Sequence, residues 1–306
     1  MAEAATKAGA LSGGASGPPE PFALRWRYAL SRVVFFVGYR LLGLRRGVIA
    51  RNLQRSFPAL TPRERQRLVR DFVRRQSELF AEIDYARHMD ADELRRRVVL
   101  LDPSGALAAP AAAVRQRVAV YVCGHQCNFE WLLLRLSLEL GSDLIGLYKP
   151  LRGHRADRYF RGIRSRFGAR LLPAKSVLRE LDAIRRARVL GLVADQVPRT
   201  SPERHWMTFL RQPTAFFKGP ERLARALRAP MAYVTMRRSQ RGRYEIEIVP
   251  LTAAGERLPA GEPTERYARA LERDIEADPA GWWWSHNRWK LQPPEPGAGQ
   301  KLEVSS

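Results

Sequence analysis

The chain has 306 residues, 45% hydrophobic and 27% charged, which is typical of a folded protein and excludes a disordered one. It is long enough to bury a large core, in one α/β domain or two smaller ones. A net charge of +22, mostly from arginine, predicts an anionic partner, either a nucleic acid or a phospholipid surface.

Residues 1–20 are rich in Ala, Gly, Ser and Pro, which predicts a disordered tail and not a signal peptide. Residues 22–44 are aromatic and aliphatic, but a spanning helix needs about 20 nearly uncharged residues. Four arginines interrupt this stretch, Arg25, Arg27, Arg32 and Arg40. On a helical wheel Arg25, Arg32 and Arg40 fall within about 80° of one another and leave a broad apolar face, which predicts a helix lying in the membrane interface; the alternative is a first core helix.

A basic cluster at 45–55 adds charge suited to anionic lipid. Thr61, Pro62 and Glu64 then form a helix-start signature, and the helix continues to about residue 87, with a short helix from Asp90. We therefore divide the chain into a disordered tail 1–20, a helical membrane-associated region 21–97, an α/β core 98–292 and a disordered tail 293–306.

Short apolar runs predict strands at 98–101, 118–123, 144–148, 170–172 and 189–194. Helical patterns separate them at 105–113, 129–140, 155–167 and 176–188. This alternation predicts an α/β fold with a mostly parallel central sheet flanked by helices. The runs 231–236 and 244–251 predict a hairpin at a sheet edge.

His125 lies in the turn between a buried strand and a leucine-rich helix, at the carboxyl end of the strand, where open α/β sheets bind ligands. If Glu130 lies in the first turns of the helix, its carboxylate can reach back to the imidazole. A carboxylate there fixes the ring tautomer and stabilises the imidazolium formed on proton transfer. His125 is therefore a candidate general base; the alternative is a helix-capping His beside an unrelated surface Glu.

Two cysteines, Cys123 and Cys127, flank this turn and are the only ones in the chain. They exclude a disulfide framework and, without further ligands, a zinc site. We expect reduced thiols in a cytosolic environment. Cys127 as a nucleophile beside His125 is an alternative to the more economical acid–base interpretation.

The turn, Gly124-His125-Gln126-Cys127-Asn128-Phe129-Glu130-Trp131, resembles the His-x4-Asp/Glu signature of the lysophospholipid acyltransferase superfamily. The form is that of the lipid A lauroyl and myristoyl acyltransferases of Gram-negative bacteria. Further blocks resemble that family in its order, at 51–53, 56–58, 148–150, 164–168, 194–196, 209–214 and 284–290. The likeness covers roughly residues 22–291. One departure is Cys127, where the family usually has Gly.

The resemblance implies an acyltransferase-type fold (glycerol-3-phosphate acyltransferase-like). It also implies transfer of a fatty acyl group from an acyl carrier protein or coenzyme A thioester to a lipid hydroxyl, with a lipid A precursor as the expected acceptor. It implies no metal and no cofactor beyond that thioester. It also implies a peripheral or monotopic protein at the cytoplasmic face of the bacterial inner membrane, with an anionic membrane surface as partner. Catalytic roles are implied for His125 and Glu130, and substrate binding for Asn128, Lys149, Arg164, Arg166, Asp195, Gln196 and Thr214.

Arg164 and Arg166 are expected to bind substrate phosphate or developing negative charge, unless they belong to a solvated basic helix face. Asp195 follows a buried strand, and the resemblance favours an orienting group over a simple cap.

An aromatic and basic cluster ends the chain, with Trp282, Trp283, Trp284, His286, Arg288, Trp289 and Lys290. It is interpreted either as a nucleic-acid platform or as a membrane anchor. The resemblance favours packing plus interface contact, with His286 as hydrogen-bonded structure and no nucleic acid. Two alternative functions stay open: the same chemistry on a lysophospholipid, amino-acid lipid or pigment, and a basic nucleic-acid-binding protein.

Overall fold

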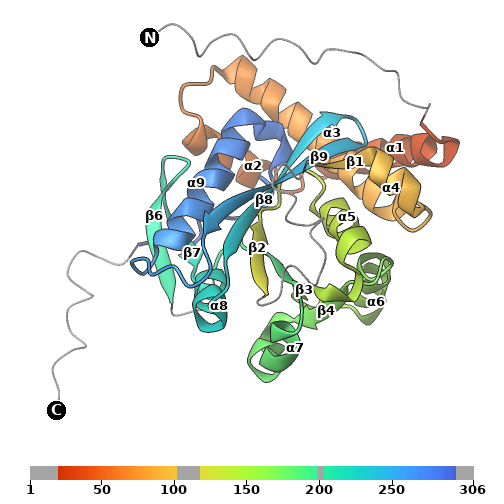
Figure 1. Ribbon diagram of the computed structural model, residues 1–306. Coiled ribbons are helices and arrows are strands. Elements are labelled where there is room, and N and C mark those ends of the chain that lie inside the picture. Colours follow the sequence, from red (N-terminus) through yellow and green to blue (C-terminus); the bar gives the residue numbers. More distant parts are fainter. Residues whose placement is uncertain (1–19, 102–117, 199–202, 294–306) are drawn as a thin grey trace, which may run out of the picture.

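A seven-stranded sheet forms the centre of the computed structural model, which describes residues 20–101, 118–198 and 203–293 (Figure 1). The strand order is β1-β9-β8-β2-β5-β3-β4, and every neighbouring pair is parallel except β8 and β9. The strands are β1 (Val98–Leu101), β2 (Ala119–Cys123), β3 (Leu144–Tyr148), β4 (Arg170–Pro173), β5 (Val189–Val193), β8 (Met231–Gln240) and β9 (Arg243–Thr252). A separate hairpin consists of β6 (Arg204–Phe209) and β7 (Gln212–Phe217).

The predicted α/β class with a mostly parallel sheet is confirmed, and the five predicted parallel strands form within a residue or two of their expected bounds. The predicted position of the β8–β9 hairpin at the sheet edge is wrong. β8 pairs with β2 and β9 pairs with β1, so β1 and β4 are the edges. Continuous burial of the first six residues of β8 is typical of an interior strand, because both of its faces are covered.

The helical elements are α1 (Phe22–Phe35), η1 (Phe36–Leu41), α2 (Arg46–Ser56), α3 (Pro62–Tyr85), α4 (Ala91–Arg97), α5 (Phe129–Leu140), η2 (Gly141–Asp143), α6 (His154–Arg164), η3 (Ala174–Arg179), α7 (Leu181–Arg185), α8 (Gly219–Leu227), α9 (Glu262–Ala277) and η4 (Pro279–Gly281). The helix expected at 176–188 is divided into η3 and α7. The helix expected at 105–113 and nearly all of both predicted tails lie outside the described residues.

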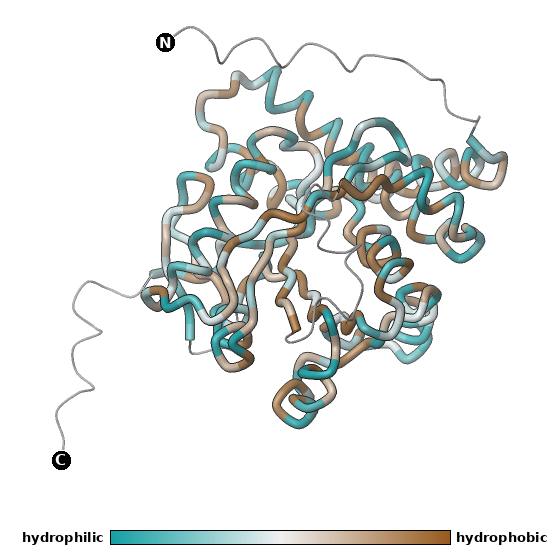
Figure 2. The backbone as a smooth tube through the Cα atoms, in the orientation of Figure 1, coloured by the Kyte–Doolittle hydropathy of each residue, from teal (hydrophilic) through white to brown (hydrophobic). Residues whose placement is uncertain are grey.

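Helices cover both faces of the sheet. Apolar residues of α5 and α6, together with α1 and α4, pack on one face, and those of α8 and α9 pack on the other (Figure 1). Figure 2 shows the hydrophobic residues concentrated along the central strands and α5. The turn that follows β2 lies where these layers meet.

The first helix contacts α3 through two buried side chains, Leu24 and Tyr28. Most of its other apolar residues stay exposed, as do most of those of η1 and the turn after it. We call this surface the apolar N-terminal patch; its side chains are 39–80% exposed and belong to Phe22, Trp26, Leu30, Val33, Val34, Phe36, Val37, Leu41, Leu42 and Leu44. Among the helices of the described residues, none combines the length and the apolar character needed to cross a bilayer.

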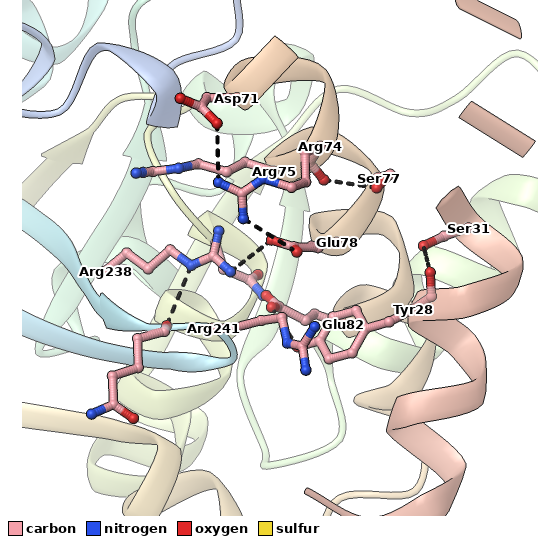
Figure 3. Close-up of polar contacts among 12 residues, drawn as sticks. Tyr28, Ser31, Asp71, Arg74, Arg75, Ser77, Glu78, Glu82, Arg238 and Arg241 are labelled. Carbon is pink, nitrogen blue, oxygen red and sulfur yellow. Dashed lines mark hydrogen bonds and ion pairs between the residues drawn. The ribbon is translucent and has the colours of Figure 1, made fainter. Parts of the chain in front are cut away.

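A buried carboxylate, Glu82 of α3, joins α1 to the turn after β2. It accepts hydrogen bonds from Tyr28 Oη at 2.8 Å, from Tyr244 Oη at 2.6 Å and from Asn128 Nδ2 at 2.8 Å. Figure 3 shows Tyr28 of α1 reaching across to Glu82, beside the ion pair that Arg238 makes with a second buried carboxylate, Glu78. Burial raises the pKa of Glu82, and the three hydrogen bonds oppose that rise. The first helix and the turn therefore share one polar centre.

Candidate active site

The backbone of the turn brings His125 close to its neighbours. A Cβ on Gly124 would lie 2.5 Å from a Leu271 methyl and 3.4 Å from an Asp195 oxygen, so only glycine fits there without movement. Tyr267 Oη donates to the carbonyl of Cys123 at 3.0 Å and holds the end of β2. The turn is thus fixed from the side of α9.

Asp195 holds His125. Strand β5 lies parallel to β2 with Val193 opposite Cys123, so the residues two positions beyond each strand, Asp195 and His125, meet. The carboxylate Oδ1 lies 2.6 Å from His125 Nδ1, and Oδ2 accepts from the backbone N–H of His125 at 2.8 Å. The indole of Trp282 donates to the same Oδ2 at 2.8 Å. The imidazole is therefore oriented by a carboxylate that is itself held in place.

The electrostatics favour an ionised Asp195. Burial, at 3% exposure, acts to raise its pKa, but the charge of protonated His125 and the hydrogen bonds from His125 and Trp282 lower the pKa to about 2. An ionised carboxylate requires the proton on Nδ1 and leaves Nε2 as the acceptor. Nε2 lies 3.2 Å from Nε2 of Gln196, a distance at which the amide donates to it. This arrangement suits a general base.

The expected contact between Glu130 and His125 is wrong. Both carboxylate oxygens of Glu130 bond instead to Arg164, at 2.8 Å from its Nε and 2.5 Å from its Nη2. Glu130 stands at the start of α5 and Arg164 in the last turn of α6, so the fork of the guanidinium meets a buried carboxylate. The orienting role expected of Asp195 agrees with the geometry, whereas Glu130 positions an arginine.

An apolar groove of about 510 Å³ lies between α5, α6 and the sheet, and His125, Glu130 and Arg164 line it. Gly146 and Gly191 are paired across β3 and β5, and their missing side chains leave space under α5. Lys149 and Gln196 add polar groups to its wall. The remaining wall is mostly apolar, with leucines such as Leu132, Leu133, Leu136, Leu144, Leu147 and Leu171 beside aromatic side chains. Its volume and apolar walls are those of a site for a lipid-like ligand.

A smaller polar cavity of about 320 Å³ also contains His125 in its wall, together with Arg45, Ser285, His286 and Asn287. Gln196 and Trp283 line both spaces. The imidazole therefore faces an apolar groove on one side and a polar cavity on the other. A larger cavity, of about 620 Å³ between α8 and the end of β9, contains none of the predicted site residues.

Three residues predicted to bind substrate have structural contacts instead, and none of them lines either space. Asn128 is buried, caps α5 by accepting from Trp131 N at 3.0 Å, and donates to Glu82. Arg166 donates to the carbonyl of Ala86. Thr214 is buried on β7.

The tryptophan cluster is part of the core and of the site wall. Trp282 and Trp284 are 2% and 0% exposed, so neither can stack on a nucleic-acid base. Trp283 packs edge-on against His125 and contacts Phe129, with ring centroids 5.4 and 5.7 Å apart. The packing expected for this cluster is confirmed. The bond from Trp282 to Asp195 was missed, because nothing local to the Trp run points to residue 195.

Both cysteines are free and buried, as expected of reduced thiols. Burial strongly raises the pKa of both thiols, which argues against Cys127 as a nucleophile. Cys127 has φ 51°, in the left-handed region that favours glycine, and this explains why Gly is usual at this position in the family it resembles. Within the described ranges, no group of three or more His, Cys, Asp or Glu side chains is placed to hold a metal ion.

Residues 19–291, which include nearly all of the described chain, match the family model of the bacterial lipid A biosynthesis acyltransferases. Among curated proteins, none has a sequence significantly similar to this one.

Proposed function

The chain belongs to the bacterial lipid A biosynthesis acyltransferase family, and we propose that it moves a fatty acyl group from an acyl carrier protein or coenzyme A thioester to a hydroxyl of a lipid A precursor. The observation that carries this proposal is the imidazole of His125, oriented by Asp195 at the wall of an apolar groove. The groove would receive the acyl chain of the donor, because its walls are apolar along α5 and the sheet.

His125 is the general base in this proposal. The acceptor hydroxyl replaces Gln196 at Nε2 and gives up its proton as its oxygen attacks the thioester carbonyl carbon. Asp195 stabilises the resulting imidazolium through Nδ1. When the tetrahedral intermediate collapses, the carbon–sulfur bond breaks and the imidazolium returns the proton to the leaving thiolate. The products are an ester and a free thiol.

Arg164 is placed to stabilise negative charge on the carbonyl oxygen. Its Nε and Nη2 bond to Glu130, which leaves Nη1 without a hydrogen-bond partner among the described residues. A guanidinium fixed on one edge loses little freedom when its other edge binds an anion. Lys149, in the same wall, adds a second positive charge for the donor.

Attachment to an anionic membrane surface, at the cytoplasmic face of the inner membrane, completes the proposal. The apolar N-terminal patch exposes its apolar side chains along α1, η1 and the turn after it, with Arg25 and Arg40 among them and Arg45 directly after them. Such a combination favours a helix lying in the headgroup layer. Phe80 lines the groove and contacts Trp283 and also Phe35, the last residue of α1, so the groove lies next to the patch.

The function is tested with an acyl carrier protein thioester and a lipid A precursor, with product detected by mass spectrometry. His125→Ala should abolish ester formation, whereas His88→Ala, an exposed histidine outside both spaces, should leave it unchanged. An active His125→Ala protein would remove the base from the mechanism. The mass of the product identifies the acyl chain and its acceptor.

Membrane attachment is tested by flotation with vesicles that contain anionic phospholipid. Trp26→Glu combined with Val34→Glu should release the protein, because both side chains belong to the apolar N-terminal patch. Leu178→Glu is the matched control, since Leu178 is 82% exposed but lies on η3. Equal flotation of all three proteins would refute the proposed attachment.

A further inference from the structure

The proposed function assigns the acyl chain of the donor to the apolar groove. The polar cavity beside His125 is then left without a ligand. It shares His125, Gln196 and Trp283 with the apolar groove, so the two spaces meet at the imidazole. In an acyl transfer, the donor and the acceptor must both reach the reacting centre without occupying the same space. If the donor chain occupies the groove, the polar cavity is left for the acceptor.

The charges around the cavity favour an anionic ligand. Arg45 contributes a guanidinium that makes no ion pair or side-chain hydrogen bond with the described residues. The carboxylate in the wall, Asp195, has both oxygens bonded to His125 and Trp282, and it forms no ion pair with that arginine. Helix α2 begins at the next residue, Arg46, without an acidic residue in its first turn, which brings the positive end of its dipole to the same rim.

We infer that this cavity binds the polar head of the acceptor lipid, and that Arg45 binds an anionic oxygen of that head, of the phosphate type. The inference rests on the proposed function, since it concerns the second substrate of the same site. Ser285 and Asn287 supply neutral polar groups of the kind that bind the hydroxyls of such a head.

The position of Arg45 also suits a lipid acceptor. Leu41, Leu42 and Leu44 immediately precede it, and their side chains are 59–68% exposed. The backbone turns sharply here, because Gly43 and Arg45 both have positive φ, 64° and 61°. An amphipathic acceptor can thus keep its chains beside these leucines, in the bilayer, while its head enters the cavity.

The first test compares a phosphorylated lipid A precursor with the same compound after phosphatase treatment. Arg45→Gln should raise KM for the phosphorylated acceptor about ten-fold, the effect of losing one charged hydrogen bond, and leave KM for the dephosphorylated one unchanged. Arg45→Lys should restore part of the loss. Arg46→Gln is the matched control, because Arg46 stacks on Tyr39 and lies outside the cavity wall. Equal effects on both acceptors, or from both glutamine variants, would overturn the inference.

The second test does not depend on the acceptor. Inorganic phosphate is added to the protein in detergent, and the ring resonances of His125, assigned with His125→Gln, are followed by NMR. They should move in the wild type and in Arg46→Gln but not in Arg45→Gln. If phosphate does not shift the His125 resonances of the wild type, the proposed anion site is refuted. If the wild type acylates no lipid A precursor, the proposed acceptor fails, and this second test alone decides the inference.

Discussion

His125 and Asp195 are 70 positions apart in the chain, yet Nδ1 of one lies 2.6 Å from Oδ1 of the other. Glu130 is only five positions from His125 and bonds to Arg164 instead. The site therefore contains two buried carboxylates with separate roles. One orients the base, and the other fixes an arginine.

Asp195→Asn should lower kcat by about 10² to 10⁴ with little change in KM, because an amide no longer stabilises the imidazolium. Glu130→Gln should lower kcat only about ten-fold, since its remaining oxygen still accepts from Arg164. Steady-state kinetics on both variants, with circular dichroism as a check of folding, tests this order. A Glu130 variant that is the more impaired of the two would return the orienting role to Glu130.

Asp195 should also make stability depend on pH. Its pKa falls from the ordinary 3.8 to about 2 on folding, so its contribution is present above about pH 4 and is lost as the pH falls towards 2. The contribution is about 2 kcal/mol. The free energy of unfolding, from urea titrations between pH 6 and pH 3, should show a gap between the wild type and Asp195→Asn that narrows below pH 4. A gap that stays constant would contradict the lowered pKa.

Glu82→Ala should destabilise the fold by about 3 kcal/mol, because three donors lose their acceptor and a cavity opens among Tyr28, Tyr244 and Asn128. Urea unfolding measures the loss. Glu139→Ala, which breaks a partly exposed pair within α5, is the control and should reduce stability by less than about 0.5 kcal/mol. Similar losses from both would show that Glu82 is not a structural centre.

Cys127→Gly should be more stable than Cys127→Ala by about 1 kcal/mol, since both remove the thiol but only glycine relieves the left-handed backbone. The comparison of two variants cancels the packing lost with the sulfur. Thermal unfolding followed by circular dichroism is sufficient. An alanine variant as stable as the glycine variant would mean that the turn relaxes around residue 127.

The strands and the turn that carries His125 were predicted from the sequence because their signals are local. Apolar runs identify β2 and β5, and the change from a strand pattern to a helix pattern identifies the turn. The capping role of Asn128 could also have been predicted, since an Asn directly before an apolar helix is a typical N-cap. The family resemblance led instead to the prediction that Asn128 binds substrate.

The partner of His125 was not predictable in the same way. It depends on which strand pairs with β2 and in what register, and a shift of one residue would turn Asp195 to the other face. Sequence proximity favoured Glu130, but opposite charge on the neighbouring helix α6 decided its contact. The interior position of β9 likewise depends on β1, which comes from the N-terminal half of the chain.

The carboxylate shared by Tyr28 and Asn128 has a practical consequence for anyone who wishes to simplify this protein. Trimming the first helix to obtain a more tractable sample would strip a donor from a buried anion and loosen the residue that caps α5. Such a shortened protein would lose activity for reasons unrelated to lipid binding. Charge substitutions on the outer side of the helix, which leave Tyr28 in place, separate the two effects.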